Sequence, residues 1–275
     1  MGRRLQNGNG LAPDIVRGTL ARTERPGRPG RRRALGHLLW AGAAGTLLWS
    51  GRHELGHLAK PADLRTAAGE RRDVTLADGT LLRLNTATIV DVRYDAVVRR
   101  ILLREGEIEV VTSPDPSGRA LWVETRDARL VPVGTRFSVL QLPDFNWLYV
   151  REGAVDLHLG ATDRPVRVTA GKQARFAPDR AILQEPLDES LQAWTEGMLV
   201  AADRRLDDLL AEVARHRAGL LQWDSEVADL RITGTWPLEG AQPTDAVLAS
   251  LERRLPVRLQ TLTRYWVRVV HRTEG

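Results

Sequence analysis

The chain has 275 residues, a formal net charge of +5 and no cysteine. This length is enough for one to three domains with buried cores, and the lack of cysteine excludes disulfides, thiolate metal sites and cysteine nucleophiles. The positive charge is concentrated at the start, because the first 33 residues contain nine arginines and two acidic residues, which leaves a net charge of −2 for the other 242. The folded part is therefore not a basic nucleic-acid surface, and we expect no nucleic-acid partner.

Residues 1–33 are rich in Gly, Pro and Arg and lack apolar periodicity, which predicts a disordered tail. Residues 34–50 follow without any Asp, Glu, Lys or Arg. This segment is near the lower limit for a transmembrane helix, for which about 20 residues are typical, and the arginines before it predict a cytoplasmic N-terminus. We therefore expect a single-pass inner-membrane protein whose bulk lies in the periplasm.

The alternative for this segment is a cleaved export signal, since Arg32 to Leu35 resemble the twin-arginine pattern. However, the small residues that a signal peptidase needs are followed by more apolar chain rather than by the polar start of a mature protein. This order favours a retained anchor.

The juxtamembrane linker, residues 51–64, contains His53, Glu54 and His57 in the His-Glu-x-x-His pattern of zinc proteases. Pro61 ends any helix there within about one turn, and no third histidine stands at the metzincin spacing. We therefore interpret the two histidines as polar residues at the membrane surface, with the protease as a minor alternative. We predict no metal, no cofactor and no catalytic residue, and hence no enzyme.

Residues 65–185 contain many short runs of alternating or β-branched residues, separated by turn dipeptides such as Asp78-Gly79. This pattern predicts a mainly β domain of the sandwich or solenoid type. Two segments, LREGEIEV at 103–110 and VREGAVDL at 150–157, repeat one pattern 47 residues apart. We expect both to form the same hairpin corner, with the glycine at positive φ, and the charged residues of the domain to lie on solvated strand faces.

The periodicity changes after Pro186. Residues 186–197 predict a connecting helix with Trp194 on its apolar side. Residues 198–275 predict strands and two helices in the order β-α-β-β-α-β(β), which is a small α+β domain. Asp203 is the expected cap of the first of these helices, whose apolar residues fall at i, i+3, i+4 and i+7.

Five segments also carry a resemblance to a known family. In chain order they are RRDVTLADGTLLRLNTATIVDVRY (71–94), LREGEIEVV (103–111), VPVGTRFSV (131–139), VREGAVDL (150–157) and VTAGKQARF (168–176). Together they resemble the periplasmic part of the FecR family, single-span regulators of extracytoplasmic-function sigma factors. Residues 198–275 resemble the STN signalling domain (secretin and TonB N-terminus), with EVARHR at 212–217 in the position of its helix motif.

This resemblance implies a signal transducer in the inner membrane. Its STN-like domain would bind the N-terminal signalling domain of an outer-membrane TonB-dependent receptor, often one for a ferric siderophore, and the message would pass to an extracytoplasmic-function sigma factor. A small sheet with free edges is a natural protein-binding surface. The candidate partner-binding residues, for which core packing is the alternative, are Leu206, Leu209, Leu210, Val213, Trp223, Trp236 and Trp266.

The start of the chain departs from the family pattern. FecR-like regulators usually carry a cytoplasmic helical domain that binds the sigma factor, whereas only residues 1–33 precede the expected anchor. Either this tail binds the sigma factor while disordered, or the true start lies upstream, or sigma control has been lost; we interpret its charge as orienting the anchor. The alternative function is a membrane-tethered periplasmic protein that binds a ligand or the envelope through its β domain and controls no sigma factor.

Overall fold

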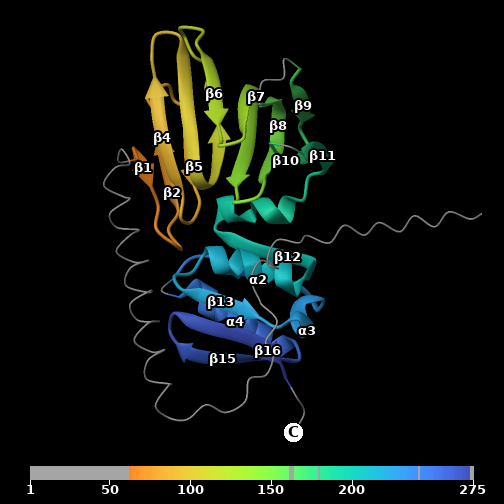
Figure 1. Cartoon of the computed structure of the whole chain (residues 1–275). Coiled ribbons are helices and arrows are strands. Elements are labelled where there is room, and N and C mark those ends of the chain that lie inside the picture. The colour runs from red at the N-terminus through yellow and green to blue at the C-terminus, as the bar shows by residue number, and fades with distance from the viewer. Residues whose placement is uncertain (1–61, 161–163, 179, 241, 273–275) are drawn as a thin grey trace, which may run out of the picture. The chain divides into compact units, whose positions relative to one another are not determined.

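The computed structural model describes residues 62–160, 164–178, 180–240 and 242–272 (Figure 1). The expected tail, the expected membrane segment and the zinc-protease motif lie outside these residues. Within them, no helix has both the length and the apolar character needed to cross a bilayer.

Eleven strands form one sheet in the first part of the described chain, which we call the β domain. The strands are β1 (Leu64–Arg65), β2 (Arg72–Thr75), β3 (Leu81–Leu84), β4 (Ile89–Tyr94), β5 (Val98–Val111), β6 (Ala120–Glu124), β7 (Ala128–Gln141), β8 (Asn146–Leu159), β9 (Val166–Thr169), β10 (Lys172–Ala177) and β11 (Arg180–Pro186). Only β5 and β6 pair in parallel; the other strand pairs of this sheet are antiparallel.

Three long strands, β5, β7 and β8, divide this sheet into two halves. One half has the order β1-β4-β5-β6-β7-β8-β9, and the other has the order β2-β3-β5-β7-β8-β10-β11. Strand β5, for example, pairs with β4 up to Glu105 and with β3 from Ile108 onward. Each long strand therefore leaves one set of neighbours and joins another at its middle.

The long strands bend at glycines with positive φ: Gly106 (90°), Gly134 (59°) and Gly153 (72°). Gly106 and Gly153 belong to the two repeated segments, so the prediction of positive φ is confirmed. The prediction of hairpin corners is wrong, because both glycines lie inside strands, where they form bulges. A Cβ at Gly106 would lie 2.4 Å from Oγ1 of Thr88, and one at Gly153 would lie 2.2 Å from the carbonyl oxygen of Gly134, so neither bend leaves room for a side chain.

The bends also shift the alternation of buried residues by one position. Strand β5 buries Ile101 and Leu103 before its bend and Ile108 and Val110 after it. Without the extra residue at the bulge, the second pair would point away from the core. Each of these four residues has a buried counterpart in β8, 47 positions later: Leu148, Val150, Val155 and Leu157. The repeated sequence pattern therefore reflects a repeated structural element.

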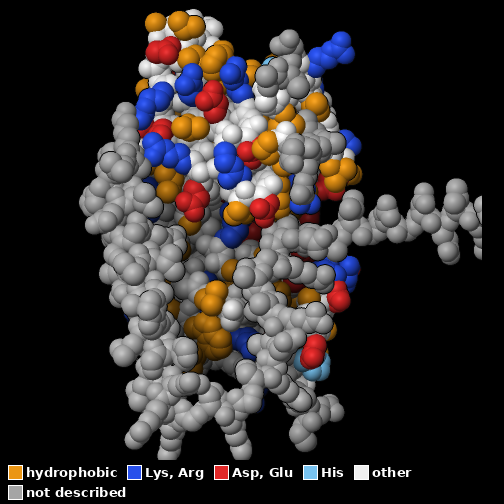
Figure 2. Space-filling model, in the orientation of Figure 1, with side chains coloured by type: hydrophobic (Ala, Val, Ile, Leu, Met, Phe, Trp, Pro, Cys, Tyr) orange, Lys and Arg blue, Asp and Glu red, His pale blue; other side chains and the backbone are white. Residues whose placement is uncertain are grey.

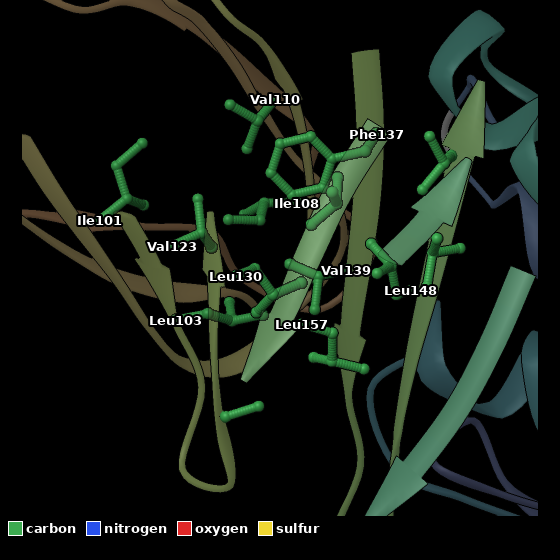
Figure 3. Close-up of a cluster of buried hydrophobic side chains, with 14 of the residues drawn as sticks. Ile101, Leu103, Ile108, Val110, Val123, Leu130, Phe137, Val139, Leu148 and Leu157 are labelled. Atoms are coloured by element: carbon green, nitrogen blue, oxygen red, sulfur yellow. The ribbon is translucent and has the colours of Figure 1, made fainter. Parts of the chain in front are cut away.

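Side chains from the two halves meet in one hydrophobic core. In Figure 3, Ile101 and Val123 from one half and Ile108 and Phe137 from the other gather between the strands. The sheet therefore folds back on itself and encloses its core as a sandwich does. The prediction of a mainly β protein is confirmed.

The chain then passes through a 3₁₀ helix into a second set of elements, which we call the C-terminal domain. In chain order they are η1 (Glu189–Glu196), β12 (Met198–Arg205), α2 (Leu206–Arg215), β13 (Leu220–Trp223), α3 (Ser225–Ala228), β14 (Arg231–Pro237), α4 (Pro243–Arg254), β15 (Val257–Thr263) and β16 (Trp266–His271). Strand β12 pairs with β14, and a separate three-stranded sheet has the order β13-β16-β15. The order of strands and helices is the one that the sequence predicts, with the short helix α3 added.

Helix α2 begins later than the sequence predicts. Strand β12 keeps its pairing with β14 as far as Arg205, so Asp203 lies inside a strand, where its side chain accepts a hydrogen bond from Arg231. The prediction that Asp203 caps the helix is therefore wrong. The first turn instead carries Asp207, whose negative charge suits the positive end of the helix dipole.

Candidate functional site

Glu107 lies directly after the bend of β5, and its carboxylate is only 2 % exposed. Its Oε2 atom accepts a hydrogen bond from Nδ2 of Asn85 at 2.8 Å and another from Nη2 of Arg215 at 2.8 Å. Asn85 directly follows β3, whereas Arg215 is the last residue of α2. This buried ion pair therefore joins the β domain to the C-terminal domain.

Arg215 also forms an ion pair within its own helix. Its Nη1 atom donates to the two carboxylate oxygens of Glu212, at 3.1 and 3.0 Å, and Nε2 of His216 lies 3.3 Å from Oε1 of the same glutamate. Residues three and four apart are neighbours on a helix surface, which explains this spacing. We call Asn85, Glu107, Glu212, Arg215 and His216 the junction cluster.

A second set of contacts fixes the end of α2 beside the cluster. Oγ1 of Thr86 donates to the carbonyl oxygen of Arg215 at 2.9 Å and accepts a hydrogen bond from the backbone N–H of Gly69 at 2.7 Å. The last carbonyls of a helix have no partner within the helix, so Thr86 satisfies one of them. A Cβ at Gly69 would lie 3.1 Å from the carbonyl oxygen of His216, so the helix end and this loop approach closely.

The charges of the cluster shift one another's pKa values. Burial raises the pKa of the Glu107 carboxyl, although the charge of Arg215 acts against it. Burial acts the same way on Glu212, but Arg215 and a hydrogen bond from His216 outweigh it, so the pKa of Glu212 lies below its ordinary value. Burial acts to lower the pKa of Arg215, but the two carboxylates hold it above its ordinary value. Burial therefore acts against the charged form of all three side chains, and their mutual attraction opposes it.

Tyr149 is buried beside these charges. Burial raises the pKa of its phenol well above the ordinary value, and the charges of Glu107 and Glu212 add to this effect. The ring is 3 % exposed and stacks on Trp147 with the centroids 5.8 Å apart. The cluster therefore lies in surroundings from which water is largely excluded.

Polar contacts extend along the same boundary to η1. Nη1 of Arg71, from the β domain, donates to the carbonyl oxygen of Trp194 at 2.8 Å, and its Nη2 lies 3.2 Å from Oε1 of Glu239. Nε1 of Trp194 and Oε1 of Gln192 are buried and have no hydrogen-bond partner among the described residues. A buried polar atom without a partner costs about 1–3 kcal/mol. This boundary is therefore polar and incompletely satisfied.

The sequence prediction for the charged residues of β5 is wrong at three positions. Arg99, Glu107 and Glu109 were expected on a solvated face, but they are 6 %, 2 % and 0 % exposed. Glu109 accepts hydrogen bonds from Nη1 of Arg83 at 2.5 Å and from Nε of Arg136 at 2.8 Å, and both arginines stand on neighbouring strands. The strand register, which one sequence does not specify, places Glu109 opposite Arg83, whereas the arginine that pairs with Glu107 comes from α2.

Elsewhere the charged side chains of the β domain are mixed in sign. On the face seen in Figure 2, basic and acidic side chains alternate over the upper part of the view. Arg167 and Asp156 form one such pair, with Nε and Oδ1 2.7 Å apart and the arginine 61 % exposed. This face carries no field of a single sign that would select nucleic acid.

The predicted partner-binding residues lie mainly in the core of the C-terminal domain. Four of them on α2 are 0 % exposed, Trp236 is 7 % exposed, and Trp223 and Trp266 are half-buried; the four are Leu206, Leu209, Leu210 and Val213. The helical spacing correctly groups these four on one face, but that face packs against the domain's own sheets. In this conformation the four residues of α2 and Trp236 therefore serve packing, whereas Trp223 and Trp266 are partly exposed.

In the part of the chain that the structure describes, no three His, Asp or Glu side chains are grouped so that they could hold a metal ion. The one histidine of the junction cluster contacts a single carboxylate, that of Glu212. The junction cluster provides a polar contact between the two domains.

Comparisons with known proteins bear on the β domain most directly. Residues 62–156 match the family model described as FecR protein. This segment contains Asn85 and Glu107 and all of β5, while α2 lies beyond it. No curated protein matches the chain.

Two solved structures have a similar fold, and both are of a candidate anti-sigma factor from Parabacteroides distasonis ATCC 8503. The first is 22% identical with a TM-score of 0.62, over 76% of this chain and 97% of that chain. The second is 24% identical with a TM-score of 0.60, over 77% of this chain and 99% of that chain. At these identities the likeness concerns the fold, and it extends over both the β domain and the C-terminal domain.

Proposed function

We propose that the chain regulates an extracytoplasmic-function sigma factor by relaying the occupancy of an outer-membrane TonB-dependent receptor. The match of residues 62–156 to the FecR model and the fold likeness to a candidate anti-sigma factor support a regulator of this kind. In this proposal the C-terminal domain is STN-like and meets the receptor, residues 34–50 anchor the chain in the inner membrane, and the chain is not an enzyme.

The observation that carries the proposal is the buried ion pair between Glu107 and Arg215. A relay needs the domain that meets the receptor to be coupled to the part of the chain that leads to the membrane. Removing one partner of a buried ion pair costs about 3–5 kcal/mol, so intermediate positions of α2 are disfavoured. The pair therefore suits an element with two discrete arrangements, which is what transmission between sites requires.

The contacts continue from Glu107 toward the first strand of the β domain. Asn85, which donates to Glu107, accepts through its carbonyl oxygen a hydrogen bond from Oγ1 of Thr66 at 2.6 Å. Thr66 directly follows β1, the first strand after the proposed anchor. A receptor that displaces α2 would thus change the position of β1. The change would pass through three consecutive contacts, from Arg215 to Glu107, then to Asn85, then to Thr66.

The test is a reporter gene under a promoter that depends on the partner sigma factor, in the native host. Deletion of the chain should abolish the reporter's response to the receptor's ligand. Arg215→Met should make the output independent of the ligand, because α2 then loses its attachment to Glu107. The matched control is Arg167→Met, which removes an arginine from an exposed ion pair. An Arg215→Met protein, present at wild-type level, that still follows the ligand would contradict the proposed route.

Binding is tested separately by calorimetry. The full chain, purified in detergent, should bind the N-terminal signalling domain of the TonB-dependent receptor encoded nearest to its gene. Saturable binding supports the receptor as the source of the signal. If the folded chain does not bind, the relay is contradicted. The sigma factor would then be the one proposed partner that remains.

A further inference from the structure

The three-stranded sheet β13-β16-β15 has one covered face and one open face. Its inner residues, such as Leu221, Val257 and Val267, are buried against the helices of the C-terminal domain. On the opposite face Leu220 is 48 % exposed and Leu262 is 76 % exposed. These two apolar side chains stand at the same end of the sheet, because Leu220 pairs with Trp266, and Leu262 directly precedes Thr263, which also pairs with Trp266.

The open face also carries basic side chains. Strand β15 contributes Arg258 and strand β16 contributes Arg268, both at exposed positions, and none of the three strands contains an aspartate or glutamate. Within the described chain, Arg268 pairs with Asp224 at 2.6 Å, whereas the exposed Arg258 forms no ion pair with a carboxylate. The face therefore attracts negative charge and offers an apolar contact beside it.

The turn between β15 and β16 is fixed by contacts with the segment at the start of β13. The backbone N–H of Leu220 donates to the carbonyl oxygen of Tyr265 at 2.7 Å, and a Cβ at Gly219 would lie 2.2 Å from that oxygen. Nη2 of Arg217, whose side chain is 5 % exposed, donates to the carbonyl oxygen of Arg264 at 3.2 Å. The exposed ring of Tyr265 therefore projects from a fixed backbone, and a fixed surface loses little entropy when a partner binds.

The polar groups of the face suit a protein better than a lipid surface. Gln222 and Gln260 both stand opposite Arg268 in the strand register, which places a row of amide and guanidinium groups across the middle of the sheet. Amide side chains donate and accept directed hydrogen bonds, which a protein surface can match. A lipid-binding face instead separates its apolar residues from a rim of Lys and Arg.

We propose that this open face, with Leu220, Leu262, Tyr265 and Trp266 at its apolar end, Arg268 in its middle and Arg258 toward its other end, is the docking surface for an acidic and partly apolar protein surface. This inference rests on the proposed function and deepens it, because the partner is the receptor's N-terminal signalling domain. The buried residues of α2 support the sheet from its inner side.

The test compares matched double variants of the full chain in calorimetric titrations with that signalling domain. Leu262→Ser with Tyr265→Ser, and separately Arg258→Glu with Arg268→Glu, should each weaken binding at least tenfold. The apolar control is Val97→Ser with Leu183→Ser, at β-domain positions that are 77 % and 51 % exposed, against 76 % and 50 % for the tested pair. The charge control is Arg65→Glu with Arg72→Glu, which are exposed positions of the β domain.

The outcomes separate the docking surface from the relay. The docking surface is supported if the two open-face variants bind more weakly than the wild type and the control variants do not. The affinity of the wild type should also fall more steeply with rising salt than that of the Arg258→Glu, Arg268→Glu variant. Wild-type binding that neither variant weakens overturns the docking surface and leaves the relay intact. Failure of the wild-type chain to bind overturns both. Cosedimentation with phosphatidylglycerol vesicles that the same variants abolish, without any effect on binding of the signalling domain, also overturns the inference in favour of a lipid surface.

Discussion

The Nη2 atom of Arg215 lies 2.8 Å from Oε2 of Glu107, although 108 positions separate the two residues in the chain. Glu107→Gln should lower the free energy of unfolding by about 1–3 kcal/mol, because it weakens a charged hydrogen bond but keeps its shape. Arg215→Met should cost about 3–5 kcal/mol, because it leaves carboxylates buried without a counter-charge. The double variant should cost less than the sum by about 1–3 kcal/mol, measured by urea denaturation.

The control for this cycle is the exposed pair of Asp156 and Arg167. Asp156→Asn with Arg167→Met should give a coupling below about 1 kcal/mol, as exposed ion pairs do. A coupling between Glu107 and Arg215 no larger than this value would mean that the junction is held by something other than the ion pair.

The bends of the long strands offer a second test, because two glycines share positive φ but differ in surroundings. Alanine at Gly106 or at Gly134 should each cost about 1–2 kcal/mol for the left-handed backbone. At Gly106 the new Cβ would also meet Thr88, which should add about 1–3 kcal/mol, whereas nothing lies within 4 Å of a Cβ at Gly134. Chemical denaturation should therefore give a clearly lower midpoint for Gly106→Ala. Equal midpoints would mean that Thr88 moves away without cost.

The positive φ of Gly106 and Gly153 could be predicted from the sequence, but the place of these glycines in the fold could not. A hairpin corner and a bulge inside a strand both need a glycine between alternating residues. What separates them is whether the strand continues with new neighbours, as β5 does when it leaves β4 for β3. Those pairings depend on contacts between residues far apart in the chain.

The apolar face of α2 is a similar case. The spacing of Leu206, Leu209, Leu210 and Val213 predicts which residues share a face, and the structure agrees. An apolar face has the same pattern whether it packs against its own sheet or against a partner, so the spacing alone could not decide between them. The role of Glu107 could not be predicted for another reason: its charge resembles that of any solvated strand residue until its contact with Arg215, on α2, is known.

Asp78 provides a test of pH dependence. Burial acts to raise the pKa of its carboxyl, but hydrogen bonds from Thr80, Arg99 and Tyr94 outweigh it, so the pKa lies below 3.8. Because the unfolded state then binds the proton more readily, stability from Asp78 is complete above about pH 3.8 and is lost as the pH falls through the folded pKa. Asp78→Asn should be less stable at neutral pH, and its stability should fall less steeply in acid.

Arg99 explains why this carboxylate matters to the fold. Besides its ion pair with Asp78 at 2.5 Å, it donates to the carbonyl oxygens of Ser113 and Arg119, both at 3.2 Å, and so ties the loop between β5 and β6 to the turn before β3. The control is Asp144→Asn at an exposed loop position. Thermal melts of both variants between about pH 2.5 and 7 check the expectation, which fails if the acid slopes of Asp78→Asn and Asp144→Asn coincide.

Leu209 distinguishes packing from binding in the C-terminal domain. Its side chain is 0 % exposed on α2, so Leu209→Ala should lower the free energy of unfolding by about 2–5 kcal/mol through lost burial and the cavity that remains. Under conditions where the variant is still folded, its affinity for the receptor's signalling domain should match that of the wild type, because the open face of β13-β16-β15 is unchanged. Circular dichroism melts and calorimetric titrations on the same preparations measure the two quantities. A loss of affinity without a loss of stability would return the α2 face to the binding surface, and it would require α2 to leave its own core when the partner arrives.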